Sequence, residues 1–88
     1  MASRETQSLP VEIDFLELAR RRGAALFRVL ADHRDGWRGW VGHYINEDRE
    51  AALRQALDLA FCYRAANASV EEIDVASGEP RPVQELAA

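Results

Sequence analysis

Asn46–Asn67, with the sequence NEDREAALRQALDLAFCYRAAN, predicts one long helix against which the other elements must pack. The stretch contains no Gly or Pro and is dense in Ala, Leu, Arg and Glu, which are strong helix formers. Asn46 is a suitable N-cap, and acidic residues follow it at the positive end of the helix dipole. We therefore expect a helix over residues 47–66. Its apolar stripe, read from a helical wheel, comprises Leu53, Ala56, Leu57, Ala60 and Phe61, widened by Ala52, Leu59 and Tyr63.

Two apolar runs on either side of Asp35-Gly36 predict a β-hairpin, with strands at residues 26–33 and 37–45. Asp-Gly is typical of a two-residue hairpin turn, because such a turn needs positive φ at both positions. The second run is rich in Trp, Tyr, Val and Ile and contains two glycines, which disfavours a helix. The periodicity of residues 24–33 fits a strand or a helix, so an all-α fold is the alternative.

A two-residue turn pairs Leu30 with Val41 and Ala31 with Trp40, and paired residues share a face of the sheet. One predicted face is aliphatic and suits the long helix: Leu26, Leu30, Val41 and Ile45. The other predicted face is aromatic: Phe27, Trp40 and Tyr44. Only a short N-terminal helix or another molecule is left to cover the aromatic face.

The remaining segments complete a small α+β domain over residues 10–77. Asp14 and Glu17 form a capping box for a helix at 15–22, which ends at Gly23 after three arginines. Residues 70–76 alternate as a strand should. If Val11–Ile13 is also a strand, the element order is that of a ferredoxin-like domain. We expect residues 1–9 to be disordered and residues 78–88, with Pro80 and Pro82, to form a flexible tail.

The composition indicates a small globular protein of the cytoplasm. The chain has 88 residues, is 48% hydrophobic and 30% charged, and carries a net charge of −4. Its single cysteine, Cys62, fits a reducing compartment and should be partly exposed on the polar side of the long helix. The sequence lacks a membrane span and a secretory signal. All eleven basic residues are arginine, which suggests a GC-rich bacterial or phage genome.

The sequence indicates neither catalysis nor a cofactor. His33 and His43 fall on opposite faces of the predicted hairpin, so they cannot share a metal ion. There is no Gly-rich phosphate loop and no nucleophile motif. We therefore expect no enzyme, no metal, no cofactor and no small-molecule substrate.

The leading functional hypothesis is a protein-binding module that forms a homodimer or docks on a larger partner through the aromatic face. The predicted contact residues are Phe27, Trp40 and Tyr44, with Arg38 and His33 at the rim and Arg64 as a further candidate. Trp, Tyr and Arg dominate the energetics of many interfaces. For Arg64, the competing interpretation is a side chain that folds back on the end of its own helix.

Two other functions remain open at this point. The first is binding of single-stranded nucleic acid, in which the same aromatic residues stack on bases and arginines contact phosphates. The acidic net charge argues against this function, because phosphate attraction supplies most of the affinity. The second is an inhibitor protein encoded by a phage or a mobile element, which is a special case of the protein-binding module.

Overall fold

The computed structural model describes residues 10–87 and confirms the α+β class. The elements are α1 (Ile13–Arg22), β1 (Ala25–Asp32), β2 (Arg38–Asn46), α2 (Arg49–Cys62), a 3-10 turn η2 (Arg64–Ala66), β3 (Ala68–Asp74) and β4 (Glu79–Leu86). The strands form one antiparallel sheet in the order β2-β1-β3-β4. The all-α alternative is wrong, because β1 occupies the segment whose periodicity was ambiguous.

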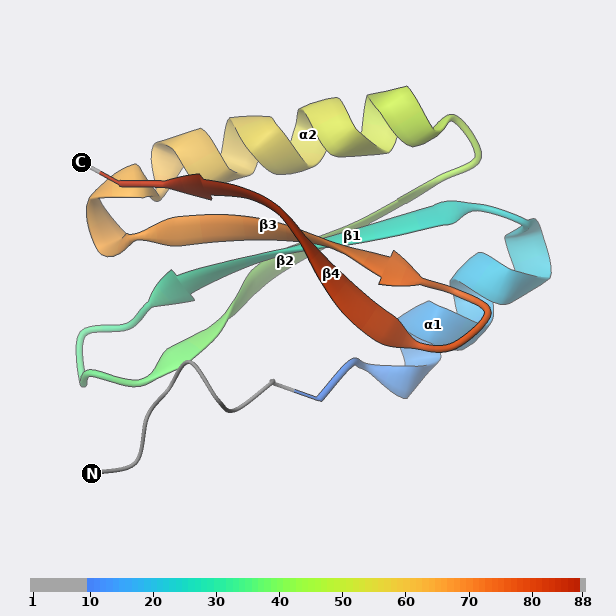
Figure 1. Cartoon of the computed structure of the whole chain (residues 1–88), viewed down its shortest axis with the longest axis horizontal. Helices are drawn as coiled ribbons and strands as arrows, with labels where there is room; N and C mark the ends of the chain where they lie inside the picture. Colours follow the sequence, from blue (N-terminus) through green and yellow to red (C-terminus); the bar gives the residue numbers. More distant parts are fainter. Residues whose placement is uncertain (1–9, 88) are drawn as a thin grey trace.

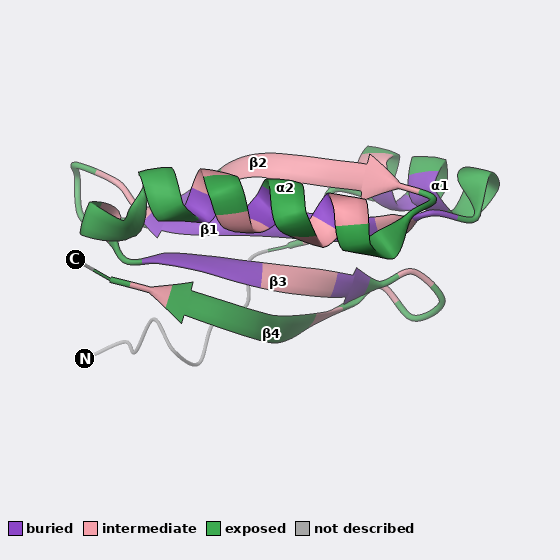
Figure 2. Ribbon diagram, turned by 90° about the horizontal axis from the view of Figure 1, so that it is seen from above, coloured by how far each residue is buried: buried purple, intermediate pink, exposed green. Residues whose placement is uncertain are grey.

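The two helices lie on opposite faces of the sheet (Figure 1). α2 connects β2 to β3 and packs along the centre of the sheet, with β1 beneath it (Figure 2). α1 covers one end of the other face, where Leu16 and Ala19 pack on Leu26 and Ile73. No strand precedes α1 within residues 10–87, so the ferredoxin-like arrangement is not confirmed.

α2 covers the opposite face from the one predicted. It packs on Phe27, Val29 and Tyr44, whereas Leu26 and Ile45 lie under α1. The centre of its buried stripe is also shifted toward three alanines one turn apart, Ala52, Ala56 and Ala60. Because the alanine side chains are small, the helix can lie close to the sheet. The large aromatic side chains of the sheet then occupy the space that remains between helix and sheet. Phe61 and Tyr63, which were assigned to the stripe, are exposed.

The hairpin is confirmed, but its turn is longer than predicted. His33 pairs with Trp37 across the turn, so three loop residues, 34–36, separate them instead of two. The Gly36 amide donates to the His33 carbonyl oxygen, and Gly36 has φ +88°. This turn shifts the register next to the loop, so Leu30 pairs with Trp40 and Ala31 pairs with Gly39. A β-bulge restores the predicted register farther along, from Val29 with Gly42 to Leu26 with Ile45. The shift moves Trp40 to the face that α1 covers.

Residues 79–86 form the strand β4, and the prediction of a flexible tail there is wrong. Pro80 pairs with Ile73 and Pro82 pairs with Glu71. The two prolines are two residues apart on an edge strand, so both of their missing N–H groups fall on the same side. That side can face away from β3 without loss of a ladder hydrogen bond. The prolines therefore mark an edge strand.

The ends of the helices agree only partly with the predicted caps. Asp48, not Asn46, is the N-cap of α2, and its side chain accepts a hydrogen bond from the Glu50 amide. α1 begins at Ile13 without a side-chain cap, so Asp14 lies in its first turn instead of capping it. Gly23 ends α1 in the predicted left-handed conformation, with φ +62°.

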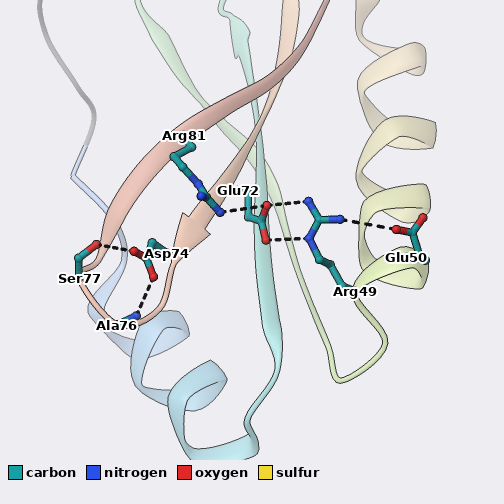
Figure 3. A network of polar contacts seen from close by, with 7 residues as sticks. All are labelled: Arg49, Glu50, Glu72, Asp74, Ala76, Ser77 and Arg81. Atoms are coloured by element: carbon teal, nitrogen blue, oxygen red, sulfur yellow. Dashed lines mark hydrogen bonds and ion pairs between the residues drawn. The ribbon is translucent and has the colours of Figure 1, made fainter.

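A charged network ties α2 to the far half of the sheet (Figure 3). Arg49, at the first turn of α2, donates to both carboxylate oxygens of Glu72 on β3, at 2.8 and 3.0 Å. Arg81 on β4 reaches the same carboxylate at 3.4 Å. The two guanidinium groups hold the pKa of Glu72 below its usual range, chiefly through the hydrogen bonds from Arg49. The network links the first turn of α2 to β3 and β4.

Candidate interaction surface

The two edges of the sheet differ in how well they are protected against pairing with another chain. The β4 edge carries Pro80 and Pro82, a bulge near Val83, and the charged side chains of Glu79, Arg81 and Glu85. Prolines, bulges and charges are the devices that natural sheets use to block edge pairing. β2 has one bulge but neither proline nor a charged residue type from residue 39 to residue 46. Among the described residues, nothing pairs with the outer side of β2.

An aromatic cluster lies along β2 on the face that carries α1. The His43 ring stacks on Phe15 of α1 with centroids 4.2 Å apart, and Trp40 meets His43 edge-on at 4.8 Å. Trp40 is 44% exposed. Within residues 10–87, neither ring nitrogen of His43 has a hydrogen-bond partner. Burial, and secondarily the charge of Arg28, lower the pKa of His43 to about 4, so the edge strand is uncharged here at neutral pH.

The tip of the hairpin carries a second exposed tryptophan. Trp37 is 54% exposed and stacks on His33 with centroids 3.9 Å apart. Gly39 lies directly under the Trp37 ring, where a Cβ atom would collide with it. The absence of that side chain lets the ring lie flat against the hairpin.

Arg38, at the start of β2, holds the hairpin to the segment that follows α2. Its guanidinium donates to Asp32 at 2.9 Å, to the Asn67 carbonyl oxygen at 2.9 Å and to the Ser69 hydroxyl at 2.6 Å. Asn67 in turn donates to Asp32. These contacts position β2 next to the start of β3 and engage much of the donor capacity of Arg38.

On the other face, a shallow groove runs between β2 and α2. It is lined by Tyr44, Gln55, Asp58, Leu59 and Cys62. Gly42 lies against Leu59, since a Cβ atom there would meet the Leu59 side chain at 2.6 Å. The groove has an apolar base and a rim with one carboxylate and one amide. The prediction that Cys62 is exposed is confirmed.

The structure separates the predicted contact residues. Phe27 is fully buried under α2, so its assignment to an exposed aromatic face is wrong. Tyr44 lines the groove on the α2 face, whereas Trp40 lies on the α1 face because of the register shift at the turn. Their shared feature is that both belong to β2. Contact with a partner through Trp40, Tyr44, Arg38 or His33 stays a prediction.

Arg64 lies in η2, directly after α2, and folds back on its own helix. Its Nη1 donates to the Phe61 carbonyl oxygen at 2.8 Å, and its guanidinium lies 3.9 Å from the centre of the Phe61 ring. The side chain thus satisfies the end of α2, as the competing interpretation expected. Its role as a partner anchor stays a prediction.

Three features of this surface were not predicted from the sequence: the exposed Trp37, the uncharged His43 and the free edge of β2. The edge could not be assigned while residues 79–86 were read as a tail, since the strand order was then open. Two prolines spaced two residues apart in an otherwise strand-like run, Glu79–Leu86, were the available signal for a protected edge.

Within residues 10–87, no group of three or more His, Cys, Asp or Glu side chains is arranged to hold a metal ion. The helices of this part of the chain are too short or too polar to cross a membrane. A scan against protein-family models, a search of curated proteins and a search of solved structures each found no match to this chain.

Proposed function

We propose that this protein is a small protein-binding module of the cytoplasm that accepts a strand of another polypeptide at the free edge of β2. The observation that carries the proposal is the contrast between the two edges of the sheet. β4 is blocked by Pro80 and Pro82, whereas β2 is uncharged and free of proline from residue 39 to residue 46. An unprotected edge is a template for main-chain pairing.

The side chains around β2 supply what main-chain pairing lacks, which is specificity. In strand addition, main-chain hydrogen bonds give affinity and pockets for alternate side chains select the partner. Trp40 offers a half-exposed indole on one face of β2, and the groove beside Tyr44 offers an apolar base on the other. Trp and Tyr are among the residues that contribute most to protein interfaces.

Photo-crosslinking in a lysate of the source organism tests this function. A photoreactive phenylalanine analogue at Trp40 should crosslink to a discrete protein, and the same analogue at Val83 on the β4 edge should not. In a pull-down, Trp40→Ala should reduce capture by about tenfold or more, whereas the matched variant Val83→Ala should leave it unchanged. Circular dichroism must show both variants folded. Equal crosslinking from the two edges would refute the assignment of β2.

A phage or mobile-element inhibitor would use the same edge, with an enzyme of the host as the partner. Binding of single-stranded nucleic acid has one feature in its favour, the exposed ring of Trp37 in the same hairpin loop as the exposed Arg34. Arg38 argues against this alternative, because its guanidinium already donates to three protein groups. Quenching of tryptophan fluorescence by an oligonucleotide, lost steeply with salt, would favour this alternative.

A further inference from the structure

Beyond its bulge, β2 is regular over Gly42–Asn46 and presents a defined set of main-chain groups to the free edge. The His33 amide donates to the Trp37 carbonyl oxygen across the hairpin, at 2.7 Å. Main-chain groups alternate in direction along an antiparallel pair, and the bulge shifts the alternation by one residue. His43 and Ile45 therefore direct their N–H and C=O groups away from β1.

We infer that Gly42–Asn46 pairs antiparallel with the same run of a second copy of this chain, around a two-fold axis at Tyr44. In this register His43 of each copy lies opposite Ile45 of the other copy, and the two exchange both main-chain hydrogen bonds. Tyr44 lies opposite Tyr44. The two sheets join into one, with both β4 edges at its ends. The inference rests on the proposed function and names the partner as a second copy.

The register is selected by the faces of the sheet. His43 and Ile45 both lie on the α1 face, so pairing them keeps like faces together. A slip of one residue would set α1-face side chains against α2-face side chains. A slip of two would bring either the bulge or the acidic segment from Glu47 onward into the pairing. No like charges oppose each other in the inferred register.

The groove beside Tyr44 explains why the second strand comes from the same protein. Tyr44 of the second copy crosses the axis next to the groove that is lined by Gln55, Asp58 and Leu59 of the first. A tyrosine has an apolar ring for Leu59 and a hydroxyl that can donate to the Asp58 carboxylate. Tyr44 of each copy thus lines the groove of its own copy and enters the groove of the other copy. The interface is self-complementary, as a two-fold dimer requires.

Sedimentation velocity over a range of protein concentrations tests the dimer. The wild-type chain should shift from monomer to dimer, and Asp58→Lys should weaken dimerisation by about tenfold or more. Asp58 is an exposed residue of α2, so the variant should keep the fold. Glu85→Lys makes the same change of charge at the β4 edge and should leave dimerisation unchanged. A monomer at every concentration, or equal weakening by both variants, overturns the inference.

Hydrogen exchange on the unmodified protein provides a second test that no variant can confound. The amides of His43 and Ile45 should exchange more slowly as the protein concentration rises. The Trp40 amide points to the same edge but lies before the bulge and should not change. If another protein protects the two amides while the chain stays monomeric, the inference fails and the proposed function stands. If nothing protects them, both fail.

Discussion

At the scale of single residues, Gly36 determines the shape of the hairpin turn. Its φ of +88° is rarely adopted by residues with a side chain, and a Cβ atom added there meets no atom of residues 10–87 within 4 Å. The positive φ therefore makes Gly36→Val costly through backbone strain. We expect the free energy of unfolding, measured in urea, to fall by about 1–3 kcal/mol.

The matched control at this position is Gly36→Asn, because asparagine tolerates positive φ better than other residues with side chains. Its unfolding free energy should lie between those of wild type and the valine variant. A valine variant as stable as wild type would show that the turn does not need this conformation.

His43 should make the stability of the protein depend on pH. Its pKa is lowered from 6.5 to about 4 in the folded state, so the unfolded chain binds the proton more readily between these values. The free energy of unfolding therefore has its full value above pH 6.5 and decreases as the pH falls toward 4. The ring is only half-buried, so we expect a loss of roughly 1–2 kcal/mol.

The measurement is urea unfolding at a series of pH values from 7 down to about 5, where most carboxylates remain charged. In His43→Gln, which cannot titrate, the slope of unfolding free energy against pH should flatten over this range. A slope equal to that of wild type would mean that a group other than His43 is responsible for the pH dependence.

At the scale of elements, β4 contributes to the fold although it contains two prolines. It pairs with β3 from Glu79 to Leu86, and Leu86 packs against the core under α2. Removal of residues 79–88 should lower the free energy of unfolding by at least about 2 kcal/mol, because several main-chain hydrogen bonds and an apolar contact are lost. A thermal melt followed by circular dichroism measures this change.

The control for this truncation is Pro80→Ala together with Pro82→Ala, which keeps the strand but removes its protection. That variant should stay folded and should aggregate more readily, because the β4 edge then also accepts pairing. A truncated chain with an unchanged melting temperature would restore the prediction of a flexible tail.

At the scale of the whole molecule, a dimer through β2 links folding to concentration. Association stabilises only the folded state, so the melting temperature should rise with protein concentration. Asp58→Lys should abolish this rise, and Glu85→Lys should retain it. Differential scanning calorimetry at low and high concentration measures the effect. A concentration-independent wild type would argue against self-association.

Local features of the sequence were enough to predict most elements. The helix predicted over 47–66 is found at Arg49–Cys62, so its existence was predicted correctly and both of its ends were not, since composition dominates helix formation. The hairpin and the strand near residue 70 followed from turn chemistry and alternation. Gly23 and Gly36 both adopt the positive φ that their positions implied. These features depend on neighbours a few residues apart, so they can be read locally.

The sequence by itself thus determined the α+β class, the hairpin and the long helix of this protein. Only the tertiary structure decided which face α2 covers, because both faces of the hairpin are apolar and the choice depends on how Ala52, Ala56 and Ala60 fit the sheet. It also decided that Trp40 and Tyr44 lie on opposite faces, since the bulge at Val41 inserts one extra residue between them and reverses the alternation. Which strand forms an open edge follows from long-range pairing of β1 with β3 and of β3 with β4, and no local pattern encodes that order.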